Sequence, residues 1–270
     1  MPSFALRLAY DGTNFHGWQR QEPPESTPLR TVQGELDRAL TEVMRASVNC
    51  QGASRTDAGV HAEGQVAAFT AECRVPLERM AAAINSRLPE DVRVMNAWPV
   101  PDDFDPVRHA LSKGYRYEIA CLRPLTARLP FDRKYVYATQ HELALEPMRR
   151  AARDLIGEHD FVSFAHTQHG RESTIRTIHN CEVLTLSDER IAIDVSSNGF
   201  LYNMVRIIAG TLVEIGRGRI DAHSVPSILA SLDRTRAGPT LPPNGLRLQW
   251  IHYPFDRAEP RLGTALPCPE

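Results

Sequence analysis

Asp57 has a side chain suited to covalent chemistry, and Arg55, a cation that could hold it, lies two positions before it. In an extended segment such side chains point to the same side, so the guanidinium can hold the carboxylate. A neighbouring cation lowers the pKa of a carboxylate and keeps it ionised, as a nucleophile requires. Gly59 permits a sharp turn that leaves Asp57 at an exposed strand end. The alternative is a turn aspartate bonded to its own backbone, and the local pattern by itself favours that alternative.

A second acidic segment, Tyr10-Asp11-Gly12-Thr13, is similar to part of the phosphoryl-accepting loop of haloacid dehalogenase-like phosphatases. The nucleophile of that loop lies two residues before its Asp-Gly-Thr, and this position is Ala9 here. The sequence therefore excludes such a phosphatase. Asp11 is predicted to be a turn residue, or one that shapes a site from its edge.

Histidines gather between positions 159 and 169, where His166 and His169 lie three apart and Asp160 follows His159. The segment is polar and contains no His-Glu-x-x-His or comparable framework. Solvated loop histidines are the better interpretation. The sequence predicts neither a metal site nor a small-molecule cofactor.

Aromatic and basic residues alternate around Tyr115 and Tyr117, with Lys113 and Arg116 beside them. Single-stranded or flipped RNA bases stack on aromatic rings and on arginine planes. Ordinary packing in a half-buried strand is the competing interpretation. It is the better one for Tyr117, and it stays open for Tyr115.

Arg206 interrupts the most apolar helical pattern of the chain, residues 200–215. A buried arginine needs a partner, and an ionised carboxylate from elsewhere in the chain would serve, whereas an arginine that reaches the surface would mean nothing. The loop with Phe15, Trp18 and Arg20 offers aromatic and polar groups to RNA, although such a tryptophan can equally pack against its own domain.

Composition places the chain among globular proteins. It has 270 residues, 42% hydrophobic and 24% charged, and a net charge of −2. No stretch approaches the roughly 20 apolar residues of a membrane span. The 5 cysteines are scattered without a Cys-x-x-Cys pair, so a reducing cytoplasm is predicted. Nearly all basic residues are arginine, which suits phosphate and base recognition but also reflects codon usage.

The hydrophobic periodicity predicts an α+β fold built from two related halves. The first half has the order β-α-β-β-α-β, the split βαβ (ferredoxin-like) arrangement, and the second half repeats it loosely, with antiparallel or mixed sheets. The first half has predicted strands at 4–10, 48–54, 65–70 and 93–100, with helices after Thr31 and Pro76. The second has strands at 115–121, 135–138, 175–186, 190–196 and 246–253, and helices at 146–156, 200–215 and 224–232.

A proline- and aspartate-rich junction near 99–106 separates the predicted halves. The N-terminal half, 1–105, would carry the Asp57 loop, and the C-terminal half, 106–255, would complete the site. Residues 256–270 have three prolines and no periodicity, which predicts a loose tail.

Several blocks together resemble the tRNA pseudouridine synthase A (TruA) family. The central block is Gly52-Ala53-Ser54-Arg55-Thr56-Asp57-Ala58-Gly59-Val60-His61-Ala62 with Gly64-Gln65-Val66. Others, in the family's order, are 10–13, 17–21, 30–33, 115–117, 157–161, 176–178, 200–206 and 242–246. The similarity spans nearly the whole chain and reverses the local preference for a turn aspartate at Asp57.

The resemblance implies the pseudouridine synthase fold, with its two halves around a central RNA-binding cleft. The implied activity is isomerisation of uridine to pseudouridine at three neighbouring positions of the tRNA anticodon stem-loop. It further implies no cofactor and no metal, a cytoplasmic homodimer as the acting form, and tRNA as the partner, with no membrane involved.

The same resemblance assigns roles to single residues. Asp57 would be the nucleophile, attacking either the base or the sugar, and Arg206 would form an ion pair with it. Arg55 would position the carboxylate and grip the flipped nucleotide. Tyr115 would stack on the uracil and assist proton removal. Leu246 would form an apolar wall under the base.

Departures from the family pattern occur at Ser54, where glycine is more usual, and at Val107-Arg108-His109. The competing hypothesis is a catalytically silent module that binds or helps to fold tRNA. The complete set Asp57, Arg55, Tyr115 and Arg206 speaks against it, because binding anionic RNA needs no carboxylate in the cleft.

Overall fold

The first part of the chain forms the predicted β-α-β-β-α-β unit. The computed structural model describes residues 1–21, 27–122, 130–166 and 172–254, so the predicted tail at 256–270 lies outside the described residues. The elements are β1 (Ser3–Tyr10), α1 (Val32–Met44), β2 (Gln51–Gly52), β3 (His61–Thr70), α2 (Leu77–Asn85) and β4 (Val92–Val100). Thr31 caps α1, since its hydroxyl accepts a hydrogen bond from the Gly34 amide, as the sequence predicts.

The second part repeats this order with additions. Its elements are β5 (Ser112–Cys121), β6 (Tyr137–Thr139), α3 (Leu145–Arg153), β7 (Gly157–Asp160), β8 (Ile175–Ser187), β9 (Arg190–Ser197), α4 (Met204–Gly216), α5 (Val225–Ser231) and β10 (Leu246–His252). The sequence did not predict β7, a four-residue edge strand whose polar residues show no alternation.

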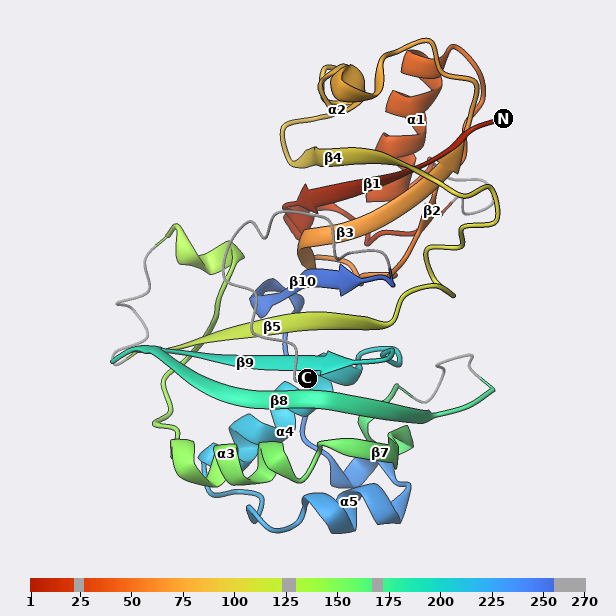
Figure 1. Ribbon diagram of the computed structural model, residues 1–270. Coiled ribbons are helices and arrows are strands. Elements are labelled where there is room, and N and C mark those ends of the chain that lie inside the picture. The colour runs from red at the N-terminus through yellow and green to blue at the C-terminus, as the bar shows by residue number, and fades with distance from the viewer. Residues whose placement is uncertain (22–26, 123–129, 167–171, 255–270) are drawn as a thin grey trace.

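One mixed sheet of 10 strands joins the two parts, with the path β4-β1-β3-β10-β5-β9-β8-β7. Strand β2 pairs with β3, so both parts have the spatial order of a split βαβ unit: fourth strand, first, third, second. Helices α1 and α2 pack at one end of the sheet, and α3, α4 and α5 at the other (Figure 1). This confirms the predicted α+β fold class.

The two parts meet where β3 and β10 run parallel, with Arg247 opposite His61 and Leu248 opposite Ala62. Gly64 makes this close approach possible, because a Cβ there would lie 2.3 Å from the Gln249 carbonyl oxygen. The loop between β2 and β3, which contains Asp57, therefore ends at this seam.

Three of the predicted boundaries that differ from the structure lie close to the Asp57 loop or to α4. The strand expected at 48–54 shrinks to β2, because the Gln65 side chain replaces the strand partner at Ser54. The strand expected at 65–70 begins already at His61. The helix expected from position 200 begins at Met204, since Asn203 has a left-handed backbone with φ of 61°.

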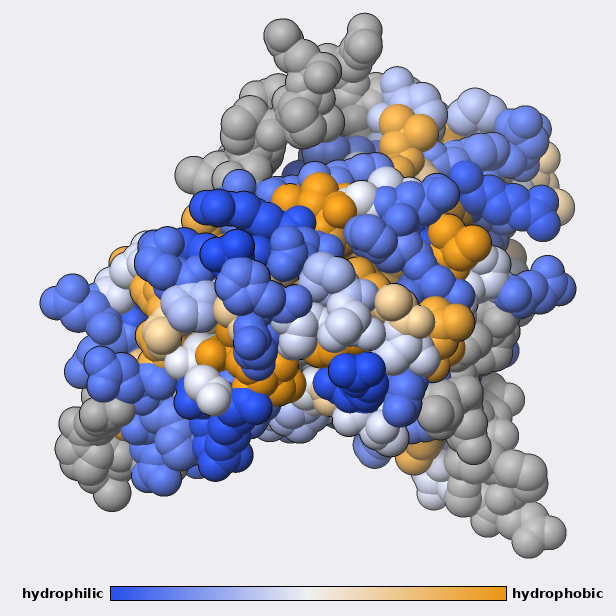
Figure 2. Space-filling model, turned by 90° about the horizontal axis from the view of Figure 1, so that it is seen from below, coloured by the Kyte–Doolittle hydropathy of each residue, from blue (hydrophilic) through white to orange (hydrophobic). Residues whose placement is uncertain are grey.

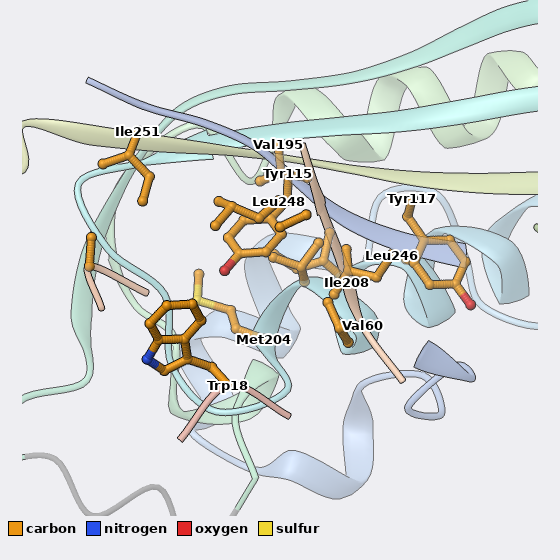
Figure 3. Close-up of a cluster of buried hydrophobic side chains, with 14 of the residues drawn as sticks. Trp18, Val60, Tyr115, Tyr117, Val195, Met204, Ile208, Leu246, Leu248 and Ile251 are labelled. Atoms are coloured by element: carbon orange, nitrogen blue, oxygen red, sulfur yellow. The ribbon is translucent and has the colours of Figure 1, made fainter. Parts of the chain in front are cut away.

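A continuous apolar core covers the inner face of the sheet. On β5, Tyr115, Tyr117 and Ile119 are buried in this core. Figure 3 shows both tyrosines in one cluster with Met204 and Ile208 of α4. Seen from below, the surface is largely hydrophilic, with apolar residues in small separate groups (Figure 2). Among the helices of the described residues, none has the length and apolar character needed to cross a bilayer.

Candidate active site

An ion pair between Asp57 and Arg206 lies at the seam. Asp57 is held in the β2–β3 loop, where Gly59 has a φ of 78°, and Arg206 is in the first turn of α4. Arg206 Nη1 donates to Asp57 Oδ2 at 3.1 Å, and the side chains are only 16% and 22% exposed, respectively. The pair joins residues 149 positions apart, one from each part of the chain.

Arg206 is fixed by two further hydrogen bonds. Its Nε donates to the Leu241 carbonyl oxygen at 2.7 Å, and its Nη1 donates to Asn203 Oδ1 at 2.8 Å. The guanidinium therefore has little freedom to turn away from Asp57. Within the described residues, no hydrogen bond ties the Asp57 carboxylate to its own backbone, so the turn-aspartate alternative is not what the structure contains.

Burial, more than the arginine, sets the ionisation of Asp57. Desolvation raises the pKa of this carboxyl above its ordinary 3.8, while the charge and hydrogen bond of Arg206 oppose the rise. The sequence-based expectation of a lowered pKa was thus wrong in direction, because it counted the cation and not the burial. A half-buried carboxylate with one fixed cation retains a free oxygen, which suits a nucleophile.

Tyr115 lies near this carboxylate and is almost fully buried, at 7% exposure. Its hydroxyl and the Ser54 hydroxyl are 2.9 Å apart, and its ring meets Phe200 edge-on at 5.1 Å between centroids. Burial raises the pKa of Tyr115, and the negative charge of Asp57 adds a smaller contribution to that rise. Tyr115 therefore presents a neutral phenol next to the carboxylate.

Leu246 opens β10 directly opposite Tyr117 and is buried, at 5% exposure. It shares the cluster of Figure 3 with Tyr115. It also borders a cavity of about 340 Å³ that Asp11, His61 and other residues line. This cavity does not include Asp57 in its lining, so it is not the centre of the chemistry proposed for that residue.

Arg55 is not brought to Asp57. The Arg55 side chain is exposed, and it forms no hydrogen bond or ion pair with any described residue. The predicted Arg55–Asp57 contact is therefore wrong for the protein without RNA. Because Arg206 already holds the carboxylate, the Arg55 guanidinium remains available to a ligand.

The loop before α1 packs against the Asp57 loop instead of facing solvent. Trp18 and Phe15 are 1% and 3% exposed, and the Trp18 amide donates to the Thr56 carbonyl oxygen. The aromatic groups suggested for RNA contact are thus structural. Asp11 is a turn residue, as expected, since its carboxylate caps the turn at Thr13 and accepts from the Tyr135 hydroxyl.

No group of three or more His, Cys, Asp or Glu side chains arranged to hold a metal occurs in the described part of the chain. His159 Nε2 donates locally to the Ile156 carbonyl oxygen at 3.2 Å, and His169 lies outside the described residues. Cys50, Cys73, Cys121 and Cys181 are free thiols, whereas Cys268 lies outside the described residues.

Comparison with known proteins agrees with this arrangement. The family model described as tRNA pseudouridine synthase matches residues 8–107 and 151–254, which include Asp57 and Arg206. Two proteins named tRNA pseudouridine synthase A are close in sequence. That of Ruminiclostridium cellulolyticum is 42% identical over 253 residues, covering 94% of this chain and 100% of the relative. That of Thermosipho melanesiensis is 41% identical over 258 residues with the same coverage.

The chain thus combines a split-βαβ sheet with a carboxylate–arginine ion pair at the seam between its two parts. The chain belongs to the tRNA pseudouridine synthase family.

Proposed function

We propose that this protein isomerises uridine to pseudouridine in the anticodon stem-loop of tRNA, with Asp57 as the nucleophile. The reaction breaks the bond between uracil N1 and ribose C1′ and forms a bond between C5 and C1′. The hydrogen of C5 leaves as a proton and N1 gains one, so no oxidant, energy source or metal ion is needed. Asp57 attacks either the base or the sugar.

The observation that supports this proposal best is the ion pair of Asp57 with Arg206, at 3.1 Å in a half-buried setting. An RNA ligand is a polyanion, and a carboxylate in its binding cleft weakens binding unless it has another task. The fixed cation opposes the rise that burial causes in the pKa of this carboxyl and so favours its ionised form. Such an arrangement suits catalysis, whereas it would not strengthen the binding of RNA to a catalytically silent module.

Three other residues complete the proposed site. Tyr115 stacks on the extruded uracil and assists removal of the C5 proton, and Leu246 forms an apolar wall under the base. Arg55 grips the flipped nucleotide through its phosphate. Extruding the base costs about a few kcal/mol, which stacking and apolar contact offset in part.

We further propose that the acting form is a cytoplasmic homodimer with one tRNA contacting both subunits. The division into an N-terminal half (1–105), a C-terminal half (106–255) and a tail belongs to the same proposal. The resemblance of the residue blocks to the TruA family supports it.

Incubation with unmodified tRNA, followed by digestion and mass spectrometry of the nucleosides, tests the function. The proposal expects pseudouridine in the anticodon arm. Tight tRNA binding without any pseudouridine would favour the silent module instead.

The rate should depend on the ionisation of Asp57. Because burial raises the pKa of this carboxyl above 3.8, catalysis should fail at a higher pH than an unperturbed aspartate would allow. We expect kcat/KM to fall as pH decreases through that raised pKa, and the rate to return when the pH is restored. A profile of kcat/KM against pH, with circular dichroism at each pH to verify folding, is the measurement. A rate that stays flat down to pH values near 3.8 would contradict it.

Replacing Arg55 by alanine should weaken tRNA binding by about 3- to 10-fold and reduce the salt slope of log Kd by about one unit, as for one lost phosphate contact. Filter binding across a salt series measures both quantities. Arg79→Ala is the charge-matched control, because this exposed arginine lies on α2, beyond β4 and away from the seam (Figure 1). Equal slopes for wild type and Arg55→Ala would reject the phosphate contact.

A further inference from the structure

Ser54 connects the Asp57 loop to Tyr115. Its hydroxyl lies 2.9 Å from the Tyr115 hydroxyl, and among the described residues the Tyr115 hydroxyl has no other hydrogen-bond partner. A buried phenol without a partner loses free energy and can rotate its O–H freely. Either hydroxyl can be the donor, and in both cases Ser54 is the described residue that orients the Tyr115 hydroxyl.

The backbone of Ser54 is itself immobilised by Gln65, which is fully buried. Gln65 Oε1 accepts from the Ser54 amide at 3.2 Å, and Gln65 Nε2 donates to the Ser54 carbonyl oxygen at 2.6 Å. The Gln65 side-chain amide thus makes the two hydrogen bonds with the Ser54 backbone that a neighbouring strand would otherwise make. With the backbone fixed in this way, only the short side chain of Ser54 has freedom, and that side chain meets Tyr115.

The same network reaches Thr56, the residue directly before Asp57. Gln65 Nε2 also contacts the Tyr10 hydroxyl at 3.3 Å, which in turn lies 2.8 Å from Thr56 Oγ1. Ser54 and Thr56 are alternate residues held toward the interior, and Asp57 follows directly. One buried set of hydrogen bonds consequently fixes both the loop that carries the carboxylate and the hydroxyl of the tyrosine.

We propose that Ser54 is a positioning residue for the isomerisation, acting through the Tyr115 hydroxyl. The proposal rests on the function proposed above. By holding the Tyr115 O–H in one direction, Ser54 keeps an oxygen lone pair facing the base that lies between Tyr115 and Asp57. Glycine or alanine at position 54 would leave the same backbone but an unanchored phenol.

A double-mutant cycle tests this role, with turnover measured as tritium release from tRNA labelled at uridine C5. Ser54→Ala should lower the rate about 10-fold, which corresponds to one lost hydrogen bond. Because Tyr115→Phe already removes the hydroxyl on which Ser54 acts, adding Ser54→Ala to that variant should change the rate less than about 2-fold. The Kd for tRNA should stay within about 2-fold throughout.

Ser227→Ala serves as the control, since it deletes an exposed serine hydroxyl on α5 that bonds the Ser224 carbonyl oxygen. Equal losses from Ser54→Ala in both backgrounds would show that Ser54 acts on packing and would overturn the proposal. So would an unchanged rate for Ser54→Ala. No tritium release by the wild type would instead reject the proposed function, so the two failures are distinguishable.

Discussion

Replacing Asp57 by asparagine is expected to lower pseudouridine formation by at least about 10⁴-fold, the scale of losing a catalytic nucleophile. Asparagine has nearly the same shape and can still accept a hydrogen bond from Arg206, which now donates at 3.1 Å. It carries no anionic oxygen to attack the substrate. Nucleoside analysis of tRNA after incubation with each enzyme measures the loss.

The charge-matched control for this variant is Asp233→Asn. The Asp233 carboxylate caps an exposed turn by accepting from the Thr235 amide and hydroxyl, and it has no place in the proposed site. This control should retain the wild-type rate. An Asp57→Asn enzyme that keeps more than about a tenth of the wild-type rate would mean that the attacking group lies elsewhere.

Replacing Arg206 by alanine is expected to lower the rate by about 10²- to 10³-fold, since it removes a preorganised charge from the reacting group. The variant also leaves the Asp57 carboxylate half-buried without its cation. Burial then acts unopposed, so the pKa of Asp57 rises further. The fall of activity on acidification should therefore begin at a higher pH than in the wild type, and raising the pH should recover part of the rate.

Two variants separate this effect from general damage to α4. Arg206→Lys keeps the charge but loses the donor to the Leu241 carbonyl oxygen, so its rate should lie between those of wild type and Arg206→Ala. Arg217→Ala removes another arginine at the end of α4, one that pairs with Glu214 and should leave the rate unchanged. A pH profile of Arg206→Ala that coincides with that of the wild type would contradict the electrostatic role.

Local rules explain why most of the fold could be predicted. Strand β1 buries Leu6, Leu8 and Tyr10 and leaves Arg7 and Ala9 partly exposed, and α1 has an apolar stripe that starts directly after a threonine cap. Such patterns depend on near neighbours in sequence. The parallel contact of β3 with β10 depends on residues that are 186 positions apart (His61 and Arg247) and on the room that Gly64 leaves, which no periodicity reveals.

In the candidate site, too, contacts between residues far apart in the sequence could not be predicted from local patterns. Arg206 and Asp57 are 149 positions apart, so only the resemblance to a family suggested their pairing. The spacing along the chain suggested Arg55 as the partner of Asp57 instead. Strand geometry predicts which side a residue faces, but it does not predict which distant cation folding brings to the carboxylate. The hydrogen-bond network of Ser54 and Gln65 was not predicted, because the residue type of a serine or glutamine does not show whether its side chain is buried.

The central claim is that the Asp57 carboxylate attacks the substrate and does not serve binding. The most direct measurement is tritium release from tRNA labelled at uridine C5, under single-turnover conditions with enzyme in excess, alongside the Kd of each enzyme for the same tRNA. Wild type should release the label while Asp57→Ala releases none and still binds tRNA at least as tightly. Equal release by both enzymes would contradict the account.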